Sequence, residues 1–143
     1  MHRKPTPRLS RNTGRTLQLG RVRASDLTRS EEAMHHQSPE MKSCIEACLA
    51  CYQACLGTAA GHCLEAGGEH TAPQHFRLML ACAEICRTAA HFMLLQSEHH
   101  RHVCRECAEI CAECALDCER IGDMQECVDA CRRCAESCRS MAL

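Results

Sequence analysis

The stretch Cys104-Arg-Glu-Cys107-Ala-Glu-Ile-Cys111-Ala-Glu-Cys114-Ala-Leu-Asp-Cys118 repeats cysteine at intervals of three, four, three and four residues. Residues three and four apart share one face of an α-helix, and a sustained alternation of these intervals is the a/d pattern of a helix facing the interior of a bundle. Charged side chains occupy several of the intervening positions. The stretch therefore predicts a helix with a column of thiols along its buried face.

Two further runs have the same spacing. One extends from Cys44 to Cys55 and the other from Cys127 to Cys138, each with intervals of four, three and four residues. A segment over residues 72–96 carries two more cysteines in phase. Four amphipathic segments joined by short loops predict an all-α fold, an antiparallel up-down four-helix bundle with the thiols inside.

Capping residues give the expected boundaries of these helices. Ser38 followed by Pro39 is typical of a helix start. Ser97 is expected to cap the third helix, and Asp123 with Glu126 three residues later resembles a capping box for the fourth. The expected helices span residues 39–66, 72–96, 97–121 and 123 onward.

Residues 1–37 differ in composition from the rest of the chain. Eight basic residues stand against three acidic ones before residue 34, and every cysteine lies at or after Cys44. Such a segment buries too little apolar surface to fold, so we expect a disordered N-terminal arm followed by a bundle domain at 38–143. A basic tether or an organelle-type leader competes here with a plain extension, or with a start of translation at Met34.

The overall composition argues against several classes of protein. The net charge of −1 and the pI near 6.8 provide no whole-chain attraction to nucleic acid. The sequence has neither the roughly 18 consecutive apolar residues of a membrane span nor the apolar core of a secretory signal. It shows no nucleophile placed with a histidine and a carboxylate, and no glycine-rich phosphate loop. We therefore expect a soluble cytoplasmic protein that is not an enzyme.

Sixteen cysteines in 143 residues predict metal binding in a reducing compartment. Cysteines four apart on an intact helix lack disulfide geometry, and zinc or iron–sulfur sites usually take their ligands from turns and loops. Cu(I) is a soft ion that selects thiolate and thioether ligands. The columns favour multiple Cu(I) ions. A general Zn(II), Cd(II) or Ag(I) sink, a thiol–disulfide redox protein and an inert helical module are the alternatives.

Histidine and methionine extend the cysteine columns at both ends. Antiparallel winding is expected to gather Met41, Met93, His100 and Met141 at one end, and His62, His75 and Met124 at the other, with Met79 following His75 in the same phase. Cys63 lies about 80° from the column of its helix if each residue advances about 100°. The candidate metal ligands are Cys44, Cys48, Cys51, Cys55, Cys63, Cys82, Cys86, Cys104, Cys107, Cys111, Cys114, Cys118, Cys127, Cys131, Cys134, Cys138, Met41, His62, His75, His100 and Met124.

Three runs carry a family resemblance: the stretch quoted above, Cys44-Ile-Glu-Ala-Cys48-Leu-Ala-Cys51-Tyr-Gln-Ala-Cys55, and Cys127-Val-Asp-Ala-Cys131-Arg-Arg-Cys134-Ala-Glu-Ser-Cys138. Over about residues 40–142 the sequence resembles the bacterial cytosolic copper storage proteins. The resemblance implies a homotetramer of cysteine-lined bundles, many Cu(I) ions held by CxxxC pairs, and ions entering at an end lined by histidine or methionine. A copper chaperone is a candidate partner for delivery. Cys63 and the arm at 1–33 depart from the family pattern.

Overall fold

The computed structural model describes residues 20–21, 23 and 37–143. The chain divides into two units, Met1–His35 and His36–Leu143. In the first unit Gly20, Arg21 and Arg23 are exposed, and the predicted disordered arm otherwise lies outside the described residues. The second unit contains the described helices and every cysteine.

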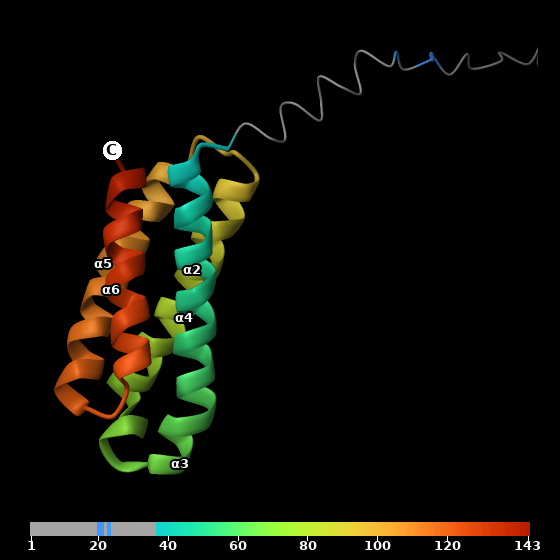
Figure 1. Cartoon of the computed structure of the whole chain (residues 1–143). Helices are drawn as coiled ribbons and strands as arrows, with labels where there is room; N and C mark the ends of the chain where they lie inside the picture. The colour runs from blue at the N-terminus through green and yellow to red at the C-terminus, as the bar shows by residue number, and fades with distance from the viewer. Residues whose placement is uncertain (1–19, 22, 24–36) are drawn as a thin grey trace, which may run out of the picture. The chain divides into compact units, whose positions relative to one another are not determined.

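The second unit is a bundle of four long helical segments (Figure 1). These are α2 (Pro39–Thr58), α4 (Pro73–Leu94), α5 (His100–Ile121) and α6 (Gln125–Met141), with the short turns η1 (Ala59–Cys63), α3 (Leu64–Ala66) and η2 (Gly68–Thr71) between α2 and α4. Around the bundle, α2 packs against α4, α4 against α5, α5 against α6, and α6 against α2. Consecutive helices run in opposite directions. The predicted all-α, up-down four-helix bundle is confirmed, and residues 37–143 contain no strand.

Capping residues determine where the continuous helical stretch formed by α2, η1 and α3 begins and ends. Ser38 Oγ accepts a hydrogen bond from the backbone N–H of Met41 at 3.1 Å. Pro39 occupies the first turn, where its missing N–H costs no intrahelical bond. The path continues through η1 and α3, and Gly67 ends it with a φ of 65°, a conformation that favours glycine.

A π-helical turn, η1, changes the direction of Cys63. In a regular α-helix Cys63 would point about 80° away from the column that ends at Cys55. A π turn holds one additional residue, which sets the helical phase back by about one residue, or about 100°. Cys63 consequently faces the interior and is fully buried. The expectation that it points away from the column is wrong.

Two predicted helix caps are also wrong in detail. Gly122 and Asp123 both adopt positive φ, of 91° and 59°, and turn the chain sharply before α6. The helix begins after this turn without a side-chain cap, so Asp123 forms no capping box. Ser97 Oγ accepts a hydrogen bond from the backbone N–H of His99 at 3.2 Å. It therefore caps a turn that precedes α5 rather than the helix itself.

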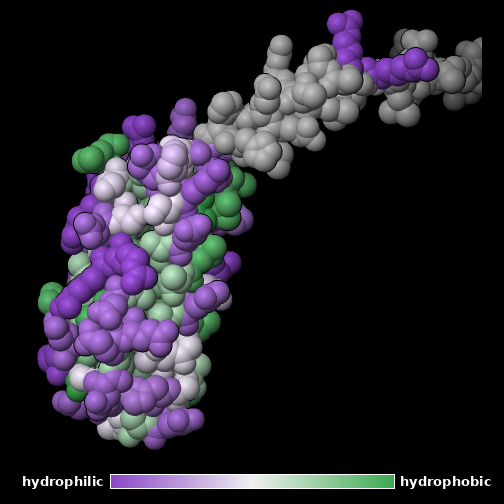
Figure 2. Space-filling view, in the orientation of Figure 1, coloured by the Kyte–Doolittle hydropathy of each residue, from purple (hydrophilic) through white to green (hydrophobic). Residues whose placement is uncertain are grey.

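Sulfur and alanine fill the interior of the bundle. All sixteen cysteines are buried and free, and most other buried side chains are alanine or methionine. Since apolar burial contributes about 25 cal/mol per Å², such a core sacrifices stabilisation that leucine would provide. The face of the bundle drawn in Figure 2 is mostly hydrophilic, with hydrophobic side chains scattered over it. The exposed leucines are Leu49, Leu56, Leu64, Leu80, Leu94, Leu95, Leu116 and Leu143. None of the helices in 37–143 has the length and apolar character needed to cross a bilayer.

Candidate metal centre

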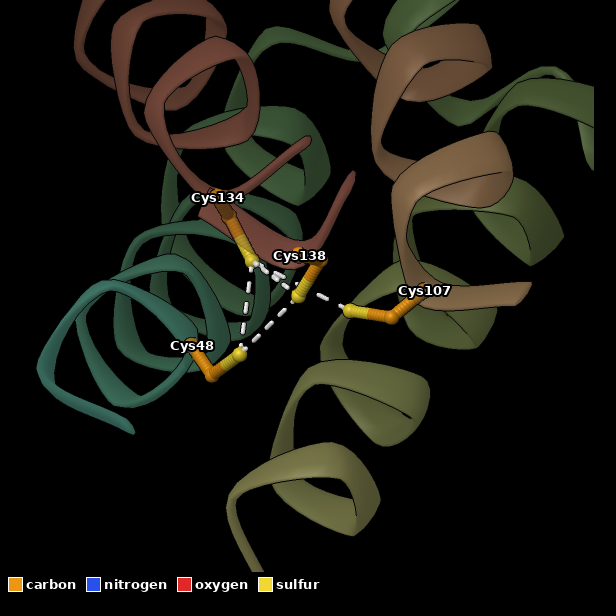
Figure 3. A group of neighbouring side chains, drawn as sticks. All are labelled: Cys48, Cys107, Cys134 and Cys138. Atoms are coloured by element: carbon orange, nitrogen blue, oxygen red, sulfur yellow. Dashed lines mark hydrogen bonds between the residues drawn. The ribbon is translucent and has the colours of Figure 1, made fainter. Parts of the chain in front are cut away.

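Four cysteines from three helices meet at one level of the bundle (Figure 3). Cys48 comes from α2, Cys107 from α5, and Cys134 and Cys138 from α6. The Sγ atom of Cys48 lies 3.4 Å from that of Cys138 and 3.6 Å from that of Cys134. The Sγ atoms of Cys107 and Cys134 are 3.9 Å apart. All four side chains are fully buried, so this level presents four thiols to one enclosed space.

Five such cysteine groups follow one another along the bundle. Within each group the Sγ atoms lie within 4.8 Å of one another, and fourteen of the sixteen cysteines belong to at least one group. Neighbouring groups share members, so the thiols form one connected lattice. The groups are Cys44/Cys104/Cys138, Cys48/Cys107/Cys134/Cys138, Cys51/Cys86/Cys111/Cys134, Cys51/Cys55/Cys82/Cys131 and Cys55/Cys114/Cys127/Cys131. Cys118 joins the last group through Cys114 at 3.9 Å and Cys127 at 4.0 Å.

The spacing of the sulfur atoms suits shared metal ions. On one helix, Sγ atoms are 3.8 Å apart in the pairs Cys51–Cys55 and Cys107–Cys111. Between helices the distance falls to 3.2 Å for Cys55 and Cys127. A disulfide requires about 2.05 Å. An ion with metal–thiolate bonds of about 2.3 Å reaches two sulfurs up to about 4.6 Å apart. These pairs therefore fall within reach of a common ion.

Hydrogen bonding among the thiols moves their pKa values in both directions. Hydrogen bonds with Cys111 and Cys131 lower the pKa of Cys51, whereas hydrogen bonds with Cys107 and Cys111 raise the pKa of Cys86. A whole column of uncompensated thiolates would carry a prohibitive cost of buried charge. The metal-free lattice must hold most of its protons, and a Cu(I) ion that replaces a thiol proton leaves the total charge unchanged.

At the end of the bundle near α3, Cys63 faces a different set of donors. Its Sγ lies 3.6 Å from Met124 Sδ, 3.7 Å from Met79 Sδ and 4.0 Å from His75 Nε2. His75 is only 2% exposed, and its Nδ1 lies 2.7 Å from Asp117 Oδ2. The structure thus brings together three of the predicted ligands with Met79, which the sequence placed in phase but not among the candidate ligands.

The opposite end of the bundle is more open. Met41 and His100 are half-buried and line a pocket of about 700 Å³ together with the exposed rings of His99 and His102. His100 Nδ1 lies 2.7 Å from the carbonyl oxygen of Ser97, which fixes one side of its ring. Met41 also packs against the core. Of the four residues expected at this end, the structure places Met41 and His100 beside the same pocket, whereas Met93 and Met141 do not line it.

His62 does not continue the cysteine column. The π turn that directs Cys63 inward leaves His62 exposed, and its ring meets that of His70 edge-on at a centroid distance of 5.0 Å. The expectation that His62 follows Cys55 in the interior is therefore wrong. His70 Nε2 lies 3.2 Å from the carbonyl oxygen of Gly122, so η2 is tied to the α5–α6 connection at this end.

Comparison with known protein families identifies the family of this chain. A family model described as copper storage protein, Csp, matches residues 36–143. The chain belongs to the copper storage protein family. The matched residues include all the described helices and every cysteine, so the thiol lattice is the interior of a copper storage family bundle.

Solved structures and a curated relative resemble this family member. The Nmul_A1745 protein from Nitrosospira multiformis is 53% identical, with a TM-score of 0.71, over 72% of this chain and 94% of that one. The Cu(I)-bound copper storage protein BsCsp3 is 38% identical, with a TM-score of 0.68, over 73% of this chain and 99% of that one. The uncharacterized cysteine-rich protein YhjQ of Bacillus subtilis (strain 168) is 39% identical over 103 residues, which are 71% of this chain and 94% of that protein.

Proposed function

We propose that this copper storage family member holds many Cu(I) ions inside its bundle and buffers copper in the cytoplasm. The observation that carries this proposal is the connected lattice, in which fourteen buried thiols form five groups with shared members. A relative with 38% identity is described as Cu(I)-bound. The role is reversible binding rather than catalysis.

The proposed ligands are the sixteen cysteines with Met41, His75, His100 and Met124. The exposed ring of His62 is left out of this set because it faces away from the interior. Thiolate and thioether donors select Cu(I), and thiolates can bridge neighbouring ions. If no thiolate bridges, two thiolates per ion give a capacity of about eight ions, and full bridging gives about sixteen.

Charge balance favours a monovalent cargo in this interior. If every thiolate bridges two ions, each entering Cu(I) displaces one thiol proton and the buried lattice stays close to neutral as it fills. A divalent ion has to displace two thiol protons to keep the same balance, so the same thiols neutralise half as many Zn(II) or Cd(II) ions as Cu(I) ions. A general sink for Zn(II) or Cd(II) is therefore the weaker proposal.

Anaerobic titration tests the storage function. The reduced full chain is titrated with Cu(I) against a bidentate Cu(I) chelator, and bound copper is measured by elemental analysis. We expect at least about eight equivalents per chain, and a limit of one or two would refute storage. Thiol counting after aerobic purification tests the redox alternative. Sixteen reactive thiols on unfolding without reductant would exclude it.

We further propose a homotetramer that receives its ions from a copper chaperone. The sequence resemblance supports the oligomer, and the exposed side chains of Leu94, Leu95 and Leu116 supply apolar surface for contacts between copies. Light scattering coupled to size-exclusion chromatography measures the mass. A monomer at micromolar concentration would contradict the tetramer without affecting the titration.

A further inference from the structure

The end of the bundle at Cys63 differs chemically from the cysteine lattice. Cys63 forms no hydrogen bond with another cysteine in residues 37–143, and it belongs to none of the five groups. The neighbours of its sulfur are the thioethers of Met79 and Met124 and the imidazole of His75. One thiol among neutral soft donors matches the ligand needs of a single monovalent soft ion.

The imidazole of His75 presents the correct nitrogen to this centre. Asp117 Oδ2 lies 2.7 Å from Nδ1, and an ionised carboxylate can only accept, so Nδ1 carries the proton and donates it. In the neutral ring the lone pair then belongs to Nε2, which faces Cys63 at 4.0 Å. Metal-binding histidines are commonly oriented by a carboxylate in this way.

The carboxylate itself is held on both oxygens. Arg120 donates to Asp117 Oδ1 from Nε at 3.1 Å and from a terminal nitrogen at 2.7 Å. Both oxygens of Asp117 therefore face hydrogen-bond donors, and the carboxylate is fixed as an acceptor behind the ring.

Separate backbone features direct the four donors to one point. The π turn brings Cys63 inward from α2, while His75 and Met79 lie four residues apart on one face of α4. Gly122 and Asp123 turn the chain so that Met124, at the start of α6, is 96% buried. Buried methionine alone is usually packing. Here, however, His75 is the single buried polar residue in the described core, and Nε2 meets only a thiol at long range.

We propose that Cys63, His75, Met79 and Met124 form a separate site for one Cu(I) or Ag(I) ion, with Asp117 as the positioning residue for His75. The inference rests on the proposed storage function and adds a site of mixed donors to it. Binding forms a bond from the ion to the Cys63 sulfur, breaks the S–H bond and releases one proton. No electron is transferred, and the pair of thiolate and monovalent ion is neutral.

Silver loading followed by nitrogen-15 NMR of the histidine rings tests this site directly. Ag(I) is monovalent, soft and closed-shell, so the full reduced chain can be titrated to saturation with AgNO₃ and observed throughout. We expect the His75 Nε2 resonance to move on loading, while Nδ1 keeps its proton. The metal count of Cys63→Ala should fall by one equivalent, and its His75 resonance should stay fixed.

Matched variants separate ligation from packing. Met79→Leu and Met124→Leu conserve volume and should each weaken binding of this ion at least tenfold in chelator competition. Met93→Leu is the control, because Met93 is equally buried near the other end of α4, and it should change neither the count nor the His75 resonance. Asp117→Ala should weaken the site about 10- to 100-fold and lose the Nδ1–H tautomer. Asp117→Asn, which keeps an acceptor, should restore most of both.

The outcomes distinguish this inference from the storage function. A saturated parent chain whose His75 resonance has not moved, or a Cys63→Ala variant with an undiminished metal count, overturns the separate site while storage stands. Equal weakening by Met93→Leu and Met79→Leu would assign the methionines to packing and overturn it as well. A parent chain that binds only one or two ions would instead refute storage.

Discussion

Deletion of Gly61 tests whether the π turn is what directs Cys63 inward. Eight residues separate Cys55 from Cys63, one more than the seven that return a helix to nearly the same phase. The π turn absorbs that extra residue. Removing Gly61 should allow a regular α-helix to place Cys63 at the same phase, and no neighbouring atom lies close to the position of a Cβ there. Insertion of alanine after Gly61 has the opposite effect.

The expected displacement follows from helix geometry. One residue corresponds to a rotation of about 100°, and a side chain at a radius of about 5.5 Å then moves by about 8 Å. The insertion should therefore carry the Cys63 sulfur out of contact with Met79 and Met124, which now lie within 3.7 Å. The deletion should leave it buried.

Thiol labelling of the folded, metal-free protein measures this difference. In the parent chain every cysteine is buried, so an aromatic disulfide reagent should find no fast-reacting thiol. The insertion variant should gain one, identified as Cys63 by peptide mass spectrometry, and should bind one metal ion fewer. The deletion variant should behave like the parent. Exposure of Cys63 by the deletion, or its protection in the insertion variant, would refute the phase argument.

Three other predictions concern the lattice and the scaffold. Cu(I) loading in an anaerobic pH-stat should release about one proton per ion if every thiolate bridges and about two if none does, so lowering the pH by one unit weakens the apparent affinity about tenfold or more per ion. Loading without proton release would contradict a protonated metal-free lattice. The double substitution Cys107→Ala and Cys111→Ala should reduce copper capacity by at least one ion, and an unchanged metal content would favour the inert helical module. Ser38→Ala should lower the free energy of unfolding in urea by about 1 kcal/mol through loss of the N-cap, whereas the exposed Ser43→Ala within α2 should not.

The architecture and most of the lattice could be predicted from cysteine spacing. A column of residues at three and four positions fixes which face of a helix is buried, and four such segments with short loops leave few arrangements. Spacing could not give the distances between helices. The contact of Cys55 with Cys127, for example, depends on how closely α2 and α6 approach, which alanine and cysteine side chains between them allow.

The end of the bundle was harder to predict, because departures from ideal helix geometry decide it. The useful signal was present in the sequence: Cys63 follows Cys55 by one residue more than a heptad, and such an excess in an otherwise continuous column marks a π turn. The same π turn moves His62 out of the column and leaves it exposed. At α6, Asp123 carried a capping pattern, but the positive φ of Gly122 and Asp123 moved the helix start beyond it.

Cysteines that belong to two groups connect the groups along the bundle. Cys138, Cys134 and Cys51 each belong to two groups. An ion bound to one of these sulfurs therefore already lies beside the cysteines of the neighbouring group. Passage to that neighbouring group would require the exchange of one metal–sulfur bond. Shared cysteines join the five groups from Cys44 to Cys127, so such exchange extends along the lattice but not to Cys63, which belongs to none of them.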